Sequence, residues 1–545
     1  MEGPLRIMRL LLLVFLLADT FAFAVTATPV RETDAVCANC HRDIFNRYVK
    51  TPMANASGLA TDHFIPGTLE NPASGLTYRV FEEDGTAWLS YHDPQAPLSD
   101  GRRKLDYFLG SGHLGVTYLY TVNQYLLESP VAYYSTTGRY DMKPGLTALR
   151  DIPPALPMEP GCLRCHMSGV QHSEPGTVNH YAQEPFLSGG ITCESCHGDT
   201  RAHVMSGGKT PAINPATLDT ARRDSLCISC HLEGDVSVEH EGRSAVDFKP
   251  GDSIADYLSY FVYASNDPTA RGVSEVEQLS ASTCKRASGS RMSCTTCHDP
   301  HYSPPAAERV SFYRGKCLTC HSDPAFVKAH HPENPDCTSC HMPRSTAQNI
   351  PHVAWTDHRI LRQPAMKVAM NDATQSNVLT PVFSPSASPR DLALAYYESA
   401  MKGRSAVRDK AYELLSQARQ AQPNDVAVLA SLGILTETRG DYQQAASIFR
   451  KVLSLDSDNL TAATNLGVLL AKSGDLPGAL KLLQPAFQRN EDMLGLAKNL
   501  AAVQCMMGDG AAAKATLAKT LVYSPDARDV LDRLKQTSSC TGSQH

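Results

Sequence analysis

Apolar residues recur at helical spacing through the C-terminal part of the chain, and the pattern repeats every 34 positions. The repeated positions are Gly433 and Gly467; Gly440, Gly474 and Gly508; Ala411, Ala445, Ala479 and Ala513; and Leu415, Phe449, Leu483 and Leu517. We predict four helix pairs, at about 390–423, 424–457, 458–491 and 492–525, and a closing helix from Ala527 to Lys535. We therefore predict an all-α solenoid over residues 390–535 and a tail over residues 536–545.

Residues 76–140 follow the two-residue period of β-strands instead. Thr77–Phe81 and Thr86–His92 alternate around an Asp-Gly turn, and Val116–Val122 and Tyr125–Tyr134 alternate around Asn123-Gln124. These two hairpins predict a small antiparallel β insertion. The run Gly110–Gly115 matches G-x-G-x-x-G, but a strand pattern follows it where a dinucleotide site needs a helix. We therefore exclude a dinucleotide site.

Residues 160–341 show little regular patterning between Pro- and Gly-rich loops. Too few apolar side chains remain there to offset the entropy of the chain. The segment 364–389 is rich in Pro, Ser and Asn, which is typical of a linker. We predict one domain over 25–363, with a core that side chains alone do not supply.

The N-terminus has the pattern of a cleaved export signal over residues 1–24. Arg6 and Arg9 precede the apolar run Leu10–Leu17, and Ala22 and Ala24 are small residues before the expected cleavage. The alternative is a retained anchor, although the apolar run is shorter than the roughly 20 residues that span a bilayer. No later segment is long enough, so we expect a soluble mature chain in the periplasm or outside the cell.

Composition narrows the class further. Of the 545 residues, 42% are hydrophobic and 19% are charged, which excludes collagen, a coiled coil and a wholly disordered chain. The formal net charge of −6 argues against nucleic acid as a partner, because nucleic-acid binding needs a basic face.

Fourteen of the 17 cysteines, two in each of seven motifs, have the spacing C-x-x-C-H. The motifs comprise Cys37, Cys40 and His41; Cys162, Cys165 and His166; Cys193, Cys196 and His197; Cys227, Cys230 and His231; Cys294, Cys297 and His298; Cys317, Cys320 and His321; and Cys337, Cys340 and His341.

This spacing suits covalent attachment of c-type haem. Residues i and i+3 share one face of a helical turn, so both thiols reach the porphyrin vinyl groups and the following histidine binds the iron. Zinc sites and disulfides are the alternatives. Zinc requires no histidine after every second cysteine, and seven units do not pair evenly into four-cysteine sites. We predict seven covalently bound haems, which would form the core of 25–363.

Haem propionates would make the protein distinctly acidic, because seven haems add roughly −7 to the charge of the chain. Such a charge favours encounter with a basic redox partner or a mineral surface of positive charge.

Twelve further histidines could supply sixth ligands to the irons, so counting does not reveal an open iron. A histidine a few residues from a proximal one does not easily reach the opposite face of the same ring. His203 and His301 are therefore expected to serve neighbouring haems.

The segments CANCHRDIFNRYVKTPMA, CESCHGDTRAHV, RRDSLCISCH, SCTTCHDPH and CTSCHMP, with VPHVAWTDHRI, resemble multihaem cytochromes related to the tetrahaem acceptor of hydroxylamine oxidoreductase. The resemblance covers about residues 34–362. It implies distal ligands at His113, His203, His301, His352 and His358. It gives less weight to His172, His330 and His331, and it leaves His63, His92, His180 and His240 as ordinary histidines.

This sequence departs from its relatives at Met53, where they often carry an axial histidine. Met53 is either a thioether ligand of the first haem, which would raise its potential, or a packing residue. Of the three cysteines outside the motifs, Cys284 lies in a loop, Cys505 in a helix of the last repeat and Cys540 in the tail. No disulfide can be assigned among them.

The predicted fold is mainly α with a small antiparallel β insertion: a multihaem cytochrome c domain followed by a tetratricopeptide solenoid. The leading hypothesis is an electron carrier whose repeats present a groove to a protein or peptide. An oxidoreductase acting on a nitrogen or sulfur oxyanion, or on hydroxylamine, at one open haem is the second hypothesis. Relatives that reduce nitrite often use C-x-x-C-K, which is missing here. A structural haem-chain subunit is the third.

Overall fold

The computed structural model describes residues 34–94, 100–146, 156–263, 273–330, 334–346, 354–362, 376–383, 387–524 and 540. The predicted export signal, the closing helix 527–535, His331 and His352 lie outside these ranges. Within them, no helix has both the length and the apolar character needed to cross a membrane.

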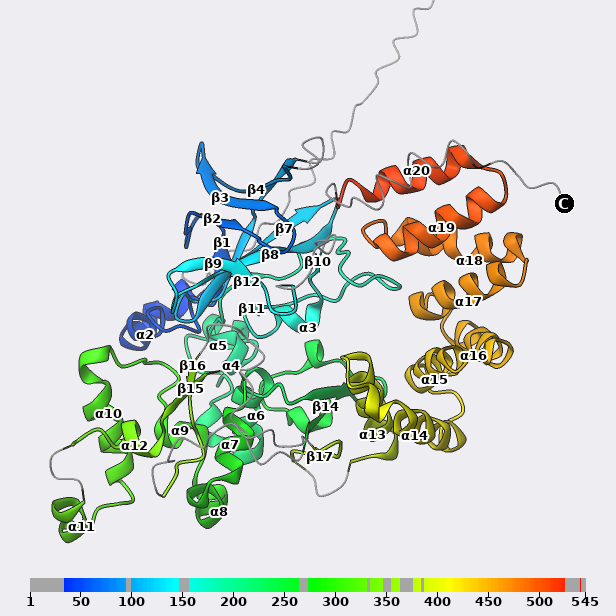
Figure 1. Ribbon diagram of the computed structural model, residues 1–545. Helices are drawn as coiled ribbons and strands as arrows, with labels where there is room; N and C mark the ends of the chain where they lie inside the picture. The colour runs from blue at the N-terminus through cyan, green and yellow to red at the C-terminus, as the bar shows by residue number, and fades with distance from the viewer. Residues whose placement is uncertain are drawn as a thin grey trace, which may run out of the picture.

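Two antiparallel sheets follow the first helix, α2 (Ala35–Tyr48) (Figure 1). One has the order β1-β6-β7-β8-β10, with β9 paired to β8, and the other has the order β2-β3-β4-β5. Their strands are β1 (Ser57–Leu59), β2 (Gly67–Glu70), β3 (Thr77–Glu83), β4 (Thr86–His92), β5 (Gly101–Lys104), β6 (Tyr107–Leu109), β7 (Gly115–Val122), β8 (Tyr125–Tyr134), β9 (Arg139–Met142) and β10 (Leu156–Pro157).

Both predicted hairpins are present, as β3–β4 and β7–β8. Asp84 and Gly85 have φ of 52° and 71°, and Asn123 and Gln124 have φ of 48° and 68°. Two positive φ values in succession are typical of the tight turn that matches the twist of a hairpin. The β region is larger than the predicted insertion, because short strands before and after the hairpins pair with them.

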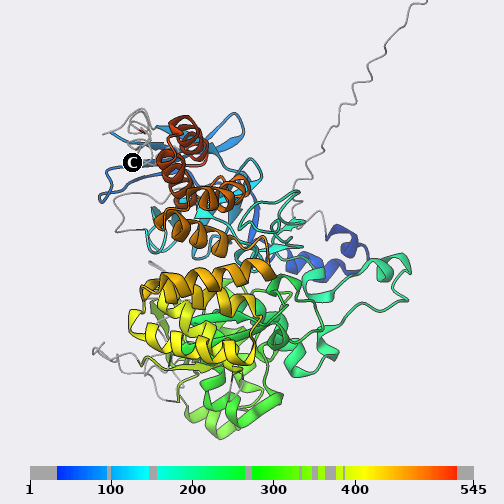
Figure 2. The ribbon, with the colours of Figure 1, turned by 90° about the vertical axis from the view of Figure 1, so that its right-hand side faces the viewer.

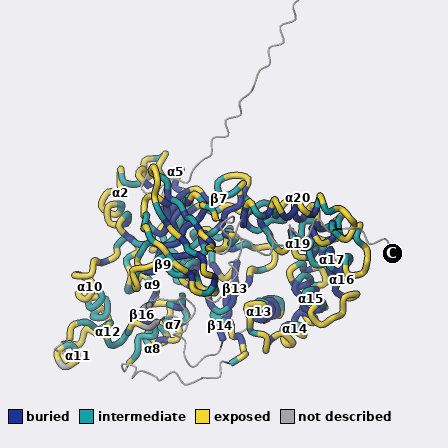
Figure 3. Tube along the Cα trace, turned by 45° about the horizontal axis from the view of Figure 1, so that its top comes forward, coloured by how far each residue is buried: buried dark blue, intermediate teal, exposed yellow. Residues whose placement is uncertain are grey.

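The middle of the chain consists mainly of short helices. They are α3 (Pro160–Leu163), α4 (Glu194–His197), α5 (Arg201–Met205), α6 (Thr220–His231), α7 (Glu275–Ala281), α8 (Thr283–Ser288), α9 (Cys294–Cys297), α10 (Ala306–Leu318), α11 (Pro324–Ala329) and α12 (Cys337–His341). Helices α9, α10 and α12 have no buried residue, and Figure 3 shows this lobe in the colours of exposed and intermediate residues. Among the described residues, helices α9, α10 and α12 therefore have no core of buried side chains.

Small sheets accompany these helices. Strands β11 (Met167–Ser168) and β12 (Ser188–Gly189) pair, as do β15 (Arg344–Thr346) and β16 (Ala354–Thr356). A third sheet joins β13 (Val236–Glu239), β14 (Leu258–Tyr263) and β17 (Leu379–Pro381). Strand β17 belongs to the segment predicted as a linker, so part of that segment is structured.

The repeats form four antiparallel helix pairs that stack on one another (Figure 2). They are α13 (Pro389–Met401) with α14 (Arg408–Ala421), α15 (Val426–Thr438) with α16 (Tyr442–Leu455), α17 (Leu460–Lys472) with α18 (Leu476–Arg489), and α19 (Leu494–Met506) with α20 (Gly510–Thr520). These bounds agree with the four predicted pairs.

Two sets of glycines explain the 34-residue signature. Gly440, Gly474 and Gly508 have φ of 86°, 89° and 84° in the turn between paired helices, a conformation that favours glycine. At Gly433 and Gly467, a Cβ atom would lie 2.6 Å from Phe449 and 2.6 Å from Leu483. The paired helices therefore approach too closely there for a side chain.

A disulfide joins Cys505 of α19 to Cys540, with the Cα atoms 5.1 Å apart. The sequence left three cysteines outside the motifs and offered no basis for pairing two of them. Cys284 is the unpaired one.

Cys505→Ser is expected to destabilise the array. Closing a loop of 35 residues lowers the entropy of the unfolded chain, and its loss costs about 3–4 kcal/mol. Urea unfolding followed by circular dichroism measures the change, and Cys284→Ser is the matched control. Equal stability of Cys505→Ser and the unaltered protein would contradict the pairing.

A buried carboxylate lies where the last repeats meet the β region. Asp492 is 3% exposed. Burial raises its pKa from 3.8 to about 6, against the opposing effects of Asn179 and His180. The folded chain therefore holds a proton between about pH 4 and pH 6 that the unfolded chain releases, and the free energy of unfolding falls as the pH rises through this window.

Asp492→Asn removes the free-energy cost of ionising a buried carboxylate. We expect the variant to be more stable than the unaltered protein at pH 7, by about 1–3 kcal/mol, and equally stable below about pH 4. Urea unfolding across pH measures the difference. Asp409→Asn is the control, because the Asp409 side chain is 89% exposed on the same array; a gain that persists at low pH would refute the titration of Asp492.

Candidate haem sites

Each C-x-x-C-H motif lies in a short helix or at the end of a longer one. The first occupies α2, where the backbone leaves helical geometry at His41 (φ −110°, ψ 39°). The fourth ends α6 and the seventh fills α12. The other four lie in or directly beside α3, α4, α9 and α10. Haem attachment requires two cysteines one helical turn apart and a histidine directly after the second.

Four motif histidines face a second histidine from elsewhere in the chain. Their ring centres are 6.2 Å apart for His41–His203, 6.0 Å for His197–His301, 6.3 Å for His298–His358 and 5.7 Å for His341–His330, with interplanar angles of 16°, 11°, 28° and 24°. A metal between two imidazoles, with metal–nitrogen bonds of about 2 Å, holds the ring centres about 6 Å apart. The spacing and the donors fit an iron in the first three pairs; in the fourth, the rings of His341 and His330 are closer and would have to separate slightly to hold one.

Hydrogen bonds at the other ring nitrogen support this fit. The Nδ1 atoms of His197, His203 and His358 lie 2.8 Å from the carbonyl oxygens of Ile213, Thr210 and Thr356. The Nδ1 atom of His341 lies 2.5 Å from the carbonyl oxygen of Leu361. Because a carbonyl only accepts, Nδ1 carries the proton and Nε2 keeps its lone pair. Metal-binding histidines are typically oriented in this way.

Burial also favours the neutral, metal-binding form of several histidines. It lowers the pKa of His298 to about 4 and lowers the pKa of His166 and His301. A neutral imidazole is the form that binds a metal.

The structure thus brings three of the predicted distal ligands, His203, His301 and His358, to motif histidines. His330, which the sequence analysis weighted less, lies opposite His341 with the Nε2 atoms 3.4 Å apart. The signal for His330 is its position at the end of α11, on the segment that leads into the seventh motif. His113 is exposed in the turn before β7, and no contact with a motif histidine is found for it in the described part of the chain.

Met53 has a packing contact in the structure. Its side chain packs against the small cluster of Tyr48 and Ala54, whereas His203 is the side chain opposite His41. This arrangement favours the packing role of Met53; its role as a ligand stays a prediction.

Three motif histidines lack such a partner among the residues that the structure describes: His166, His231 and His321. The ring of His321 stacks instead on Phe326 at 5.6 Å, and Phe326 stacks on His330 at 4.6 Å.

Cysteines of different motifs lie side by side. Free thiols of different motifs are in contact in four pairs: Cys37 with Cys193, Cys165 with Cys230, Cys227 with Cys294, and Cys317 with Cys337. Cys196 also lies near Cys230, and Cys297 near Cys320. By these contacts the motifs follow one another in the order one, three, four, five, six, seven, and the second adjoins the fourth.

These contacts do not build a four-cysteine zinc site. Over the described ranges, the group of three metal-binding side chains whose ligand atoms lie within 4.8 Å of one another is Asp34, Cys37 and Cys193. The Asp34 carboxylate is already engaged, because it accepts a hydrogen bond from the backbone N–H of Cys193 at 3.1 Å. The zinc alternative gains no support from this geometry.

Two segments of the chain match known families. Residues 140–198, which include the second and third motifs, match the family of cytochrome c554 and c-prime. Residues 438–486 match the tetratricopeptide repeat. No curated protein matches the chain.

Solved structures similar to the chain include tetratricopeptide proteins. A thermophilic protein of this kind from Thermus thermophilus is 18% identical, with 28% of this chain and 82% of that chain covered and a TM-score of 0.24. YrrB, described as having an unusual peptide-binding site, is 20% identical, with 27% and 76% covered and a TM-score of 0.24. MamA is 19% identical, with 28% and 87% covered and a TM-score of 0.23.

The family matches thus fall on two different parts of the chain. Residues 140–198 are similar to the cytochrome c554 and c-prime family, which suggests covalently bound haem and electron transfer, and residues 438–486 are similar to the tetratricopeptide repeat, which suggests interaction with protein.

Proposed function

We propose that this protein is an exported heptahaem c-type cytochrome that passes single electrons between redox partners. The observation that carries the proposal is the set of four imidazole pairs, each formed by a motif histidine and a second histidine outside the motifs, with ring centres 5.7 to 6.3 Å apart, close to the spacing of an iron ligated on both sides. Haem, when bound, supplies reversible one-electron chemistry.

The residues of the chain have separate tasks in this proposal. Two cysteines of each motif hold a porphyrin by thioether bonds, and the motif histidine offers Nε2 to the iron. Backbone carbonyls at Ile213 and Leu361 fix the orientation of His197 and His341. The exposed lobe of α9, α10 and α12 obtains its core from the porphyrins, because its helices bury no side chain.

The thiol contacts set the order in which electrons would travel. Motifs one, three, four, five, six and seven form one series, and motif two branches from motif four. Electrons would enter or leave at the two ends of this series, near α2 and near α12. The partners would be redox proteins, and the acidic charge that haem propionates add favours basic ones.

Export is supported by the disulfide Cys505–Cys540, because disulfides persist in oxidising compartments. It agrees with the signal pattern of residues 1–24. The faces of the repeat array that its own chain leaves uncovered would bind a protein or peptide.

A second function is favoured by one observation. His166, His231 and His321 face no second histidine among the described residues, and an iron bound by one of them could keep a position for a small ligand. A multihaem oxidoreductase acting on a nitrogen or sulfur oxyanion, or on hydroxylamine, is the corresponding proposal. The first motif is not a candidate for this open position, because His203 faces His41.

Intact-mass spectrometry of the native protein tests the haem content. We expect seven haem increments on the chain that starts near Val25. Cys294→Ser weakens one attachment and should lower haem retention at the fifth motif after acid and solvent extraction, whereas Cys284→Ser, ten residues away, should leave seven. Fewer than seven increments in the unaltered protein, or bound zinc, would refute the heptahaem proposal.

Electron paramagnetic resonance separates the two functions. An electron carrier with every iron closed gives only low-spin signals that nitrite, hydroxylamine and sulfite leave unchanged. A high-spin signal that one of these compounds alters would favour the oxidoreductase.

A further inference from the structure

One edge of the repeat array contacts the proposed haem domain of the same chain, residues 25–363, at several points. This edge consists of the first turn of α13 at residues 388–391, the turns before α15, α17 and α19 at residues 422–425, 456–459 and 490–493, and Tyr523. Figure 1 shows the two ends of the array, α13 and α20, beside the small sheet of β14 and beside β7–β8.

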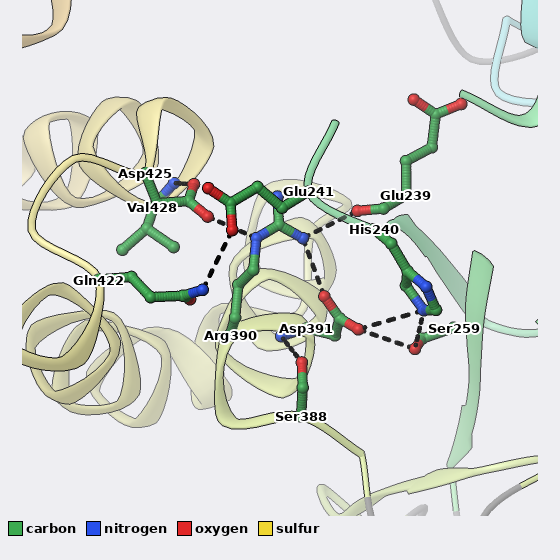
Figure 4. Close-up of polar contacts among 10 residues, drawn as sticks. All are labelled: Glu239, His240, Glu241, Ser259, Ser388, Arg390, Asp391, Gln422, Asp425 and Val428. Carbon is green, nitrogen blue, oxygen red and sulfur yellow. Dashed lines mark hydrogen bonds and ion pairs between the residues drawn. The ribbon is translucent and has the colours of Figure 1, made fainter. Parts of the chain in front are cut away.

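At the first end, buried charges link the two parts (Figure 4). Arg390 donates to the carboxylates of Asp425 at 2.5 Å and Asp391 at 2.8 Å, and to the carbonyl oxygen of Glu239 in β13 at 2.8 Å. The side chains of Arg390, Asp391 and Asp425 are 11%, 6% and 1% exposed. Removing one partner from such a buried group leaves an uncompensated charge, which is strongly destabilising.

The carboxylate of Asp391 also reaches into the haem domain. Its Oδ2 accepts a hydrogen bond from the Ser259 hydroxyl at 2.9 Å and lies 3.4 Å from Nε2 of His240. Gln422 donates to Glu241 at 3.1 Å. The array thus holds both β13 and β14 by polar side chains.

Apolar packing joins the same elements. Phe261 and Tyr263 of β14 belong to one hydrophobic cluster with residues of α13 to α17. Tyr260, the residue before Phe261, belongs to a different cluster with Leu232 and Ile254. Because successive side chains of a strand point to opposite faces, β14 presents one face to the array and the other to the haem motifs.

The face of β14 that carries Tyr260 is linked to two haem motifs. Tyr260 contacts Arg164, which lies between the two cysteines of the second motif. Arg164 in turn donates a hydrogen bond to the carbonyl oxygen of Ser229, which lies between the two cysteines of the fourth. The position of β14 therefore bears on the junction of the second and fourth motifs.

At the other end, the contacts are made by the β region and by the loop between β11 and β12. The Tyr125 hydroxyl donates to the carbonyl oxygen of Arg489 at 2.8 Å, and Asn490 donates to the carbonyl oxygen of Gly176 at 2.9 Å. At Gly176, with φ of 76°, a Cβ atom would lie 2.9 Å from the Asp458 carbonyl oxygen. The loop approaches the array too closely for any residue but glycine.

We infer that the repeat array binds its own haem domain along this edge. Through β14 it acts as a brace, which here means that it fixes the position of the second haem motif relative to the fourth. The occupant of the edge is the same chain, so an external partner must use another face of the array. The effect on the haems rests on the proposed function; the binding of the array does not.

A nicked protein tests the binding. A specific protease site is introduced within residues 366–371, and the purified full chain is cut there. We expect both fragments to elute together in equal amounts at physiological salt, because contacts at both ends and strand β17, which stays with the array, hold them. Elution as separate fragments would overturn the proposal whether or not haem is present.

Arg390→Ala tests the brace itself. In the nicked form we expect this variant to separate at a urea concentration at which the nicked unaltered protein stays intact. In the uncut form, redox titration should show shifted potentials for a minority of the haems. Arg439→Ala is the matched control, because Arg439 pairs with Asp409 on the array alone, at 3.1 Å. Unchanged potentials in uncut Arg390→Ala would overturn the role in fixing the haems.

Discussion

The His301→Ala variant is expected to change one haem completely, from a low-spin iron with two histidine ligands to a high-spin iron that binds carbon monoxide. His301 lies opposite His197 with the ring centres 6.0 Å apart and the planes within 11° of parallel. Loss of one imidazole leaves one coordination position open. Because the third motif lies inside the series of thiol contacts, electron transfer between the two ends should slow as well.

Electron paramagnetic resonance and carbon monoxide difference spectra measure the change. His172→Ala is the matched control: His172 is paired with Asp247 at 2.9 Å, and its side chain is 56% exposed. The control should keep the spectra of the unaltered protein. If His301→Ala also kept them, His301 would not be the ligand opposite His197, and the interpretation of the other three pairs would weaken with it.

Features that depend on local chemistry are the ones that the sequence can predict. Haem attachment requires two cysteines and a histidine within five residues, so each motif is complete in itself. The repeats are similarly local, because Gly440 and Gly474 report a turn conformation and Gly433 and Gly467 a close approach of neighbouring helices. The two hairpins carried their own turn residues.

The distal histidines are a different problem, because three of the four pairs join distant segments. His41 and His203 are far apart in the sequence, and the helix break at His41 and the Thr210 carbonyl that orients His203 are features of the folded chain. The resemblance to known cytochromes predicted His203, His301 and His358 as ligands, and the structure places each opposite a motif histidine. It gave less weight to His330, which also lies opposite one. A distal ligand is a single histidine without a surrounding motif, so the sequence does not distinguish the ligands among the twelve candidate histidines.

The attachment of the array to the haem domain was not predictable from patterns at all. Nothing in the Pro-, Ser- and Asn-rich segment 364–389 marks Leu379–Pro381 as a strand, because its partner β14 lies more than a hundred residues earlier. Arg390, Asp391 and Asp425 read as the exposed charges of helix ends. Their burial depends on β13, which only the folded chain brings to them.

This attachment changes how the repeats are understood. A tetratricopeptide array is usually considered a module that binds other proteins. Here the hydrophobic cluster that fills its first three helix pairs also includes Val236, Phe261 and Leu379 of the small sheet. A shared core of this kind makes the array and the sheet one cooperative unit, because neither buries its apolar face without the other.

The Phe261→Ala variant tests that cooperativity and should show the largest loss of stability. Phe261 is fully buried in the cluster that the array shares with the haem domain, and truncating such a side chain costs about 3–5 kcal/mol. Far-ultraviolet circular dichroism reports the helices of the array, and Soret absorbance reports the haem domain. In the unaltered protein both signals should change at one urea concentration; in Phe261→Ala both midpoints should fall.

Phe383→Ala is the matched control, because Phe383 is 41% exposed beside Tyr260 of the same sheet. It should lose far less stability, since an exposed ring leaves no cavity. If Phe261→Ala lowered the midpoint of one signal and left the other in place, the array and the sheet would unfold independently. The shared cluster would then be a contact between two separate units, and the brace would have no mechanical effect on the haem motifs.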